Sequence, residues 1–176
     1  MVGATRPRCL IMISLISSSG ETFETNVYSC LHCKTIANFI EEDAGVDCIP
    51  LPNVTSYVLD KILDFFNERL RLAREITISP TLESEDTLDD AQLHTLRYRS
   101  MTYLQENTTE VLLRVLTAAN YLHCEILIDL ISSVIASRLA GKGRDEMRAI
   151  LGIENDFTEE EEAQVLAESA WAFFQN

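Results

Sequence analysis

The C-terminal segment combines strong negative charge with large apolar side chains, and this combination constrains the fold more than any other feature. From Glu154 to Asn176 there is no lysine or arginine, and seven acidic residues supply half of the formal net charge of −14. The segment ends in Trp171, Phe173 and Phe174, which a solvated acidic tail does not need. We expect a helix whose apolar face packs on the chain's own core or on a partner. Taken alone, the segment favours the chain's own core.

Composition limits the class of protein and its partners. The chain has 176 residues and 47% hydrophobic content, which is enough for one domain with a substantial core. A pI near 4.5 argues against binding to nucleic acid or to anionic membranes and favours a basic partner surface. Five cysteines without a regular framework indicate reduced thiols, and therefore a protein of the cytoplasm and nucleus. No stretch is long enough to span a membrane.

The N-terminal half predicts a small sheet with helices. Residues 9–17 and 22–25 read as a β-hairpin that turns at Gly20. The short apolar run behind Arg6 and Arg8 also resembles a signal-peptide core, but its β-rich composition favours the hairpin. A helix over 29–43, with Ile36, Phe39 and Ile40 on one side, is followed by an extended edge segment at 48–52 and by a helix that Asn53 or Thr55 caps and that ends near residue 70.

The C-terminal half predicts a loop followed by several helices. Residues 71–107 lack sustained periodicity, and Ser79–Asp90 carries Pro80 and five acids, so we expect a loop or disordered insert with short helical pieces. Apolar periodicity predicts helices over 109–122 and 125–140. A third helix, 144–151, should end at Gly152, and Thr158 with Glu161 should form the capping box of a final helix.

No catalytic motif is present, and we expect no enzymatic activity, no cofactor and no metal. The nearest candidate is Cys30-Leu31-His32-Cys33, whose spacing suits a metal site or a redox pair. His123 and Cys124 would complete four metal ligands, but nothing in the sequence brings them to the first pair. The glutamates at 159–162 lack the alternating spacing of a calcium loop.

Five segments of the chain form a pattern in a fixed order: Ser18–Phe23, Pro50–Val54, Ala118–Leu122, Gly141–Lys142 and Ile153–Val165, the last of which contains Asn155-Asp156-Phe157-Thr158. Together they resemble one family, the Skp-type adaptors of SCF (Skp–cullin–F-box) ubiquitin ligases. The resemblance covers about residues 10–70 and 108–171 in order, and such collinear agreement is hard to reach by chance.

This resemblance implies an α/β fold: a BTB/POZ-like core over 9–140, with a variable loop at about 71–107, and two further helices within 141–176. It implies a non-enzymatic adaptor that binds a cullin through one surface and F-box proteins through another, and self-association of the free protein is a further expectation. By position, Asn120 and Tyr121 would bind the cullin. The implied F-box-binding residues are Leu116, Ile131, Ile150, Ile153, Asn155, Asp156, Phe157, Val165 and Trp171.

The chain departs from the family's pattern in three places. Residues 71–107 lack the usual acidic loop and its Trp-Asp pair, Gly143-Arg144 stands where many members carry Thr-Pro, and Phe173 and Phe174 replace charged residues. Two other functions stay open: an Elongin C-like adaptor, which would lack the helices expected at 144–174, and a self-associating BTB scaffold without a ligase role.

Overall fold

The computed structural model describes residues 12–42, 47–78 and 85–173, and it divides into two compact units between Ala140 and Gly141. Arg6, Arg8, Cys9, Pro80 and Phe174 lie outside the described residues, as do the side chains of Trp171 and Phe173. No described helix is both long enough and apolar enough to cross a membrane.

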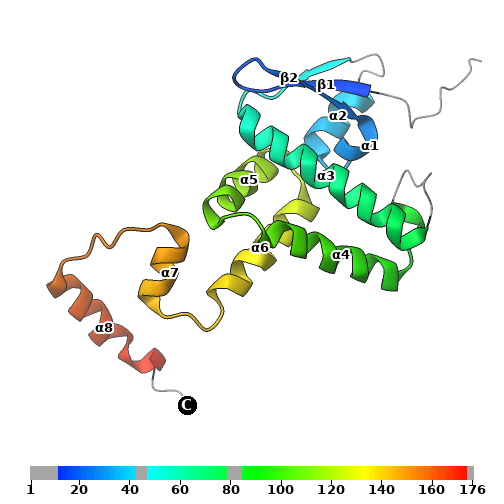
Figure 1. Ribbon diagram of the computed structural model, residues 1–176. Helices are drawn as coiled ribbons and strands as arrows, with labels where there is room; N and C mark the ends of the chain where they lie inside the picture. The colour runs from blue at the N-terminus through cyan, green and yellow to red at the C-terminus, as the bar shows by residue number, and fades with distance from the viewer. Residues whose placement is uncertain (1–11, 43–46, 79–84, 174–176) are drawn as a thin grey trace, which may run out of the picture. The chain divides into compact units, whose positions relative to one another are not determined.

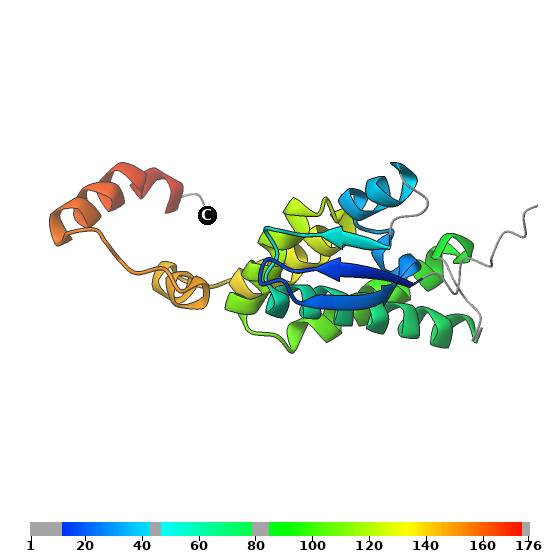
Figure 2. The same ribbon diagram turned by 90° about the horizontal axis from the view of Figure 1, so that it is seen from above.

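A three-stranded sheet begins the first unit, with β1 in its centre (Figure 2). β1 (Met12–Ile16) and β2 (Thr22–Asn26) form the predicted antiparallel hairpin, in which Gly20 has a positive φ of 81°. β3 (Cys48–Pro50) pairs in parallel with the other side of β1 and forms an edge, as expected of a strand that contains proline. The helices of this unit lie on one side of the sheet (Figure 1), towards which β1 buries alternate residues.

The predicted helix over 29–43 is wrong in one respect, because the structure divides it into α1 (Val27–Cys30) and α2 (Lys34–Glu42). The amides at the start of α2 donate to carbonyls of a distant turn, Lys34 N to His123 O at 3.4 Å and Thr35 N to Leu122 O at 3.2 Å. The first amides of a helix need partners from outside the helix, and here residues almost 90 positions away provide them. Ile36 is buried, whereas Phe39 is exposed.

α3 (Ser56–Thr77) begins after Thr55, as one of the two predicted caps requires, and continues seven residues beyond the expected end at 70. Its last turns are highly charged, and Arg71 pairs there with both Glu68 and Glu75 along the helix surface. Its inner face supplies much of the core: Val58, Leu59, Ile62, Leu63, Phe65, Phe66, Leu72 and Ala73.

The prediction of a loop with short helical pieces is wrong for α4 (Asp90–Gln105), which is a continuous helix. Only Leu96, Ser100 and Leu104 are buried, so the helix carries too narrow an apolar stripe to show periodicity. Its start did carry a signal: the Asp89 carboxylate accepts from Gln92 N at 2.8 Å, and the Gln92 side chain accepts from Asp89 N at 3.0 Å.

A buried ion pair joins α3 to the short helix η2 (Glu85–Thr87) and to α4. Arg69 is only 5% exposed and donates to both carboxylate oxygens of Glu85, at 2.7 and 2.8 Å. Its remaining nitrogen donates to the buried hydroxyl of Ser100 at 2.9 Å. His32 Nε2 also lies 3.7 Å from the Glu85 carboxylate. Because the loss of Arg69 would remove both short hydrogen bonds from a carboxylate that is held away from water, this pair fixes the position of η2 and α4.

The remaining helices confirm the predictions closely. α5 (Thr109–Tyr121) and α6 (Glu125–Leu139) pack their apolar faces into the core of the first unit, where Leu112, Leu127 and Leu130 are almost fully buried. Arg138 at the end of α6 donates to the carbonyls of Gln105 and Asn107, at 3.0 and 2.6 Å, and so holds the connection between α4 and α5. The second unit contains α7 (Arg144–Leu151) and α8 (Glu159–Phe173).

We expect Arg69→Ala to lower the free energy of unfolding by about 3–5 kcal/mol, because Glu85 would stay largely buried without its partner. Arg97→Ala is the matched control, since Arg97 pairs with Asp129 at the surface and its loss should cost less than about 1 kcal/mol. Urea unfolding followed by circular dichroism measures both. Equal losses in the two variants would contradict a special role for the buried pair.

Candidate partner-binding surfaces

The connection between α7 and α8 has a defined conformation. Gly152 ends α7 in the left-handed region, with φ of 68°, as the sequence predicts. Ile153 N then donates to Arg148 O at 2.9 Å, and Phe157 N donates to the Asn155 side chain at 3.4 Å. The guanidinium of Arg148 lies 6.0 Å from the centroid of the Phe157 ring, within range of a cation–π interaction. These contacts place Ile153 and Phe157 in one ordered loop.

Glu162 links the two helices of this unit. Its carboxylate lies 2.9 Å from Arg144 Nη1 and 3.3 Å from Arg148 Nη1, and it accepts from Asn155 Nδ2 at 3.5 Å. Asn155, one of the predicted partner-binding residues, is exposed, and its side chain also contacts Phe157 N and Glu162. Its role in this structure is to shape the segment that carries Phe157.

The predicted capping box at the start of α8 is confirmed. Thr158 donates from both its amide and its hydroxyl to Glu161 Oε2 at 2.9 Å, and Glu161 N donates back to the Thr158 hydroxyl at 3.3 Å. The amide of Thr158 and then its hydroxyl lower the pKa of Glu161 below its usual value of 4.5. The cap therefore contributes fully above that value and is lost as the pH falls through the lowered pKa.

Several predicted partner-binding residues of the second unit present apolar surface. Ile153 is 56% exposed, and Phe157 and Val165 are each 48% exposed. Ile150 is half-buried on α7, and Asp156 is exposed in the loop. Trp171 lies within α8, but its side chain is outside the described part of the chain. Three large apolar side chains are therefore exposed within residues 153–165, an acidic stretch of thirteen residues that has no basic residue.

The two predicted F-box-binding residues of the first unit, Leu116 and Ile131, differ in accessibility. Leu116 on α5 is half-buried and keeps some surface. Ile131 on α6 has an exposure of 0%, so its side chain belongs to the core and presents no surface to a partner. Sequence periodicity placed Ile131 on an apolar face but did not show how deeply that face is covered.

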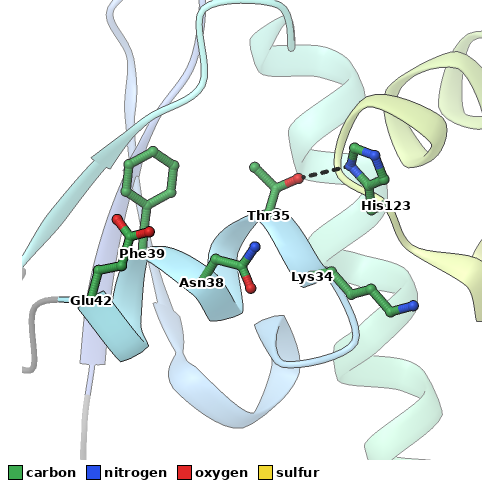
Figure 3. A pocket seen from close by; sticks show the side chains of 6 residues that line it. All are labelled: Lys34, Thr35, Asn38, Phe39, Glu42 and His123. Atoms are coloured by element: carbon green, nitrogen blue, oxygen red, sulfur yellow. Dashed lines mark hydrogen bonds between the residues drawn. The ribbon is translucent and has the colours of Figure 1, made fainter.

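Asn120 and Tyr121, the residues expected to bind a cullin, lie at the end of α5. Asn120 is exposed and Tyr121 is half-buried. The Tyr121 carbonyl accepts from Thr35 Oγ1 at 3.2 Å, which ties this corner to α2. Beside it is an open pocket of about 330 Å³, shown in Figure 3 and lined by Lys34, Thr35, Asn38, Phe39, Glu42 and His123. No sequence pattern indicated that α2 would border this corner.

His123 adopts a left-handed conformation, with φ of 53°, in the turn between α5 and α6. Its Nδ1 faces Thr35 Oγ1 at 3.2 Å, as Figure 3 shows. The candidate metal set is therefore only partly assembled: Cys33 and Cys124 meet, whereas His123 is directed to Thr35. In the part of the chain that the structure describes, no group of three or more His, Cys, Asp or Glu residues is arranged to hold a metal ion.

Comparison with known proteins identifies the class of protein that these features define. Residues 11–71 match the model of the Skp1 family tetramerisation domain, a POZ domain, and residues 125–172 match the Skp1 family dimerisation domain. The first unit accordingly has a BTB/POZ-like α/β fold.

Curated relatives extend this match over most of the chain. SKP1-like protein 13 of Arabidopsis thaliana is 38% identical over 164 residues, which are 92% of this chain and 97% of that protein. SKP1-like protein 1A of the same plant is 37% identical, over 92% of this chain and 96% of its own. SKP1-like protein 1 of Oryza sativa subsp. japonica is 32% identical, over 92% and 95%. The chain belongs to the Skp1 family.

We expect Thr158→Ala to raise the pKa of Glu161, because one of the donors to its carboxylate is lost. Amide hydrogen exchange in the first turn of α8 should become about fivefold faster, the effect of losing a typical N-cap. NMR titration and exchange measure the two effects. Glu160→Gln is the control, since it removes a charge from the same turn and none of the cap hydrogen bonds; similar exchange in both variants would contradict the cap's importance.

Proposed function

We propose that this protein is a non-enzymatic adaptor subunit of an SCF-type ubiquitin ligase, which bridges a cullin scaffold to F-box substrate receptors and so serves ubiquitin-dependent degradation. Membership of the Skp1 family supports the adaptor role. The observation that carries the proposal is the open apolar surface of Ile153, Phe157 and Val165 on an ordered α7–α8 unit.

The energetics suit a docking surface for apolar helices. Full burial of a side chain such as Phe157 or Val165 contributes about 1.5–3 kcal/mol. Part of that gain offsets the cost of ordering both partners. The contacts of Glu162 with Arg144, Arg148 and Asn155 order the loop before a partner arrives, which reduces that cost.

Charge defines the second property of this surface. Glu159, Glu160 and Glu161 are exposed at the start of α8 and lie in the sequence between Phe157 and Val165. A receptor with basic residues near its apolar helices would be attracted at long range, and wrong partners would be repelled. In our proposal, Phe157, Val165 and Trp171 make the main contacts, Ile150, Ile153 and Leu116 support them, and Asp156 lies at the rim.

The cullin-binding part of the proposal rests on the corner of Asn120 and Tyr121. Asn120 is accessible, and the carbonyls of residues 121–123 are fixed by hydrogen bonds from Lys34 and Thr35. A corner that is rigid before binding loses little entropy on association. We propose that a cullin binds here and that the protein acts in the cytoplasm and nucleus, which cell fractionation would test.

Two alternatives predict different results. An Elongin C-like adaptor would lack the α7–α8 unit, so the presence of these helices favours the Skp-type proposal. A self-associating BTB scaffold would form oligomers without binding a cullin, which light scattering with and without a cullin N-terminal fragment would distinguish. Self-association of the free protein is compatible with the adaptor role if the cullin or an F-box protein displaces it.

We expect Phe157→Ala and Trp171→Ala to weaken capture of F-box proteins by about tenfold or more, because each removes one buried apolar contact. Tyr121→Lys should instead weaken cullin capture and leave F-box capture intact. Quantitative pulldown from cell extract measures both partners at once. Tyr98→Ala is the control, since Tyr98 is 69% exposed on α4, far in sequence from both sets. If the first three variants keep every partner, the assignment fails.

Partner binding should also change the dynamics of the second unit. We expect amide exchange across residues 144–173 to slow when an F-box partner is present, because the partner covers helices that have no fully buried side chain among their described residues. Exchange within α3 and α6 serves as the internal control and should change little. Equal protection of 144–173 in the free and bound protein would contradict docking at this surface.

A further inference from the structure

Two cysteines that are 91 positions apart meet inside the first unit. Cys33 lies in the turn before α2, and Cys124 lies in the turn before α6. Both are buried, with exposures of 1% and 0%, and the residues next to them are joined, because Lys34 N donates to His123 O at 3.4 Å. The two thiols lie close enough for each to shift the pKa of the other through a hydrogen bond. Sulfur atoms within hydrogen-bonding range need only a small adjustment of two turns to reach bonding distance.

The surroundings distinguish the two thiols. The hydrogen bond from Cys33 lowers the pKa of Cys124, and the backbone amide of Leu127, at the start of α6, and the nearby charge of Arg69 act in the same direction. Burial and the charge of Glu125 oppose this shift. The same hydrogen bond, followed by burial, raises the pKa of Cys33. A sulfur at a helix N-terminus close to a guanidinium is the environment of reactive cysteines.

The third buried thiol of this region behaves differently. Burial raises the pKa of Cys30 to about 12, which keeps its sulfur protonated. Cys30 and Cys33 have the spacing that suggested a redox pair in the sequence, but the partner of Cys33 in the structure is Cys124. Folding therefore selects a different pair from the one that sequence spacing indicates.

The residues that follow Cys33 and precede Cys124 are accessible from solvent. Lys34 and His123, which adjoin Cys33 and Cys124 in sequence, are both exposed and line the pocket of Figure 3. Both cysteines lie in turns between helices, and hydrogen bonds of 3.2 and 3.4 Å join these turns. Local opening of the two turns, without unfolding of the core, would admit a molecule the size of hydrogen peroxide.

We propose that Cys33 and Cys124 form a reversible intramolecular disulfide when the protein meets a peroxide. The Cys124 thiolate attacks one peroxide oxygen and breaks the O–O bond, giving a sulfenic acid and hydroxide, which takes up the thiol proton to become water. Cys33 sulfur then attacks the sulfenic sulfur, forms the S–S bond and releases a second water. In sum, two thiols and one hydrogen peroxide give one disulfide and two waters; sulfur is oxidised and peroxide oxygen is reduced.

The disulfide would replace the contact between the two thiols by a covalent link between the α1–α2 turn and the α5–α6 turn. The second turn directly follows Asn120 and Tyr121, and Thr35, at the start of α2, donates to the Tyr121 carbonyl. Oxidation would thus add a covalent constraint to this corner, whatever partner binds there. The inference depends on the pairing of the thiols and does not depend on the proposed adaptor function.

The test is to treat the reduced full-length protein with hydrogen peroxide, remove the excess with catalase, alkylate the remaining thiols and map disulfides by mass spectrometry. We expect a peptide containing Cys33 to be linked to the peptide containing Cys124, in the monomer, with loss of two hydrogens and full reversal by dithiothreitol. Because trypsin leaves Cys9, Cys30 and Cys33 in one peptide, fragmentation must locate the linked residue.

Matched variants assign the link. Cys30→Ala should keep it, Cys33→Ala and Cys33→Ser should abolish it, and Cys48→Ser, which removes an exposed thiol, should leave it unchanged. Circular dichroism establishes that each variant is folded. The proposal is overturned if Cys124 is linked to Cys30, if only intermolecular disulfides form, or if Cys33 and Cys124 of the wild-type protein are both still free for alkylation after denaturation.

Discussion

Polar contacts shape the described part of the second unit, and this constraint governs how that unit presents its surface. Among the described residues after Gly141, no side chain is fully buried. Polar contacts fix the α7–α8 connection instead: the capping box of Thr158 and Glu161, and the contacts of Glu162 with Arg144 and Arg148. Charges and caps determine this shape, and the apolar side chains of Phe157 and Val165 stay exposed.

The first unit differs, because it has a buried apolar core and its polar groups form hydrogen bonds and an ion pair at the edges of that core. Arg69 is surrounded by apolar residues of α3, and its charge is matched by Glu85 from a segment sixteen positions away. The start of α2 is completed by carbonyls of the α5–α6 turn. Each contact joins parts of the chain that would otherwise leave charges or amides unsatisfied. The corner of Asn120 and Tyr121 is rigid for this reason.

Local signals predicted most elements but not their burial. The hairpin at Gly20, the helix end at Gly152 and the cap at Thr158 each depend on residues within a few positions, so they could be recognised in the sequence. α4 was missed because its stability comes from three buried residues and its neighbours, and its surface is polar. For the candidate site, the sequence shows that Phe157, Val165 and Ile131 are apolar. Only the structure shows that the first two are exposed and that Ile131 is inaccessible.

The sequence by itself determined the periodicity, the caps and the acidic, aromatic end of the chain, since these follow from short-range backbone and side-chain chemistry. Only the tertiary structure decided that α1 and α2 separate, that Asn155 shapes its own loop, and that Cys33 meets Cys124. The separation of α1 from α2 and the meeting of Cys33 with Cys124 have the same physical reason. In both cases the contacting residue is about ninety positions away in the sequence, so no local pattern encodes the contact. Within the acidic segment, only the tertiary structure shows that Phe157 and Val165 are exposed, because exposure depends on what the rest of the unit covers.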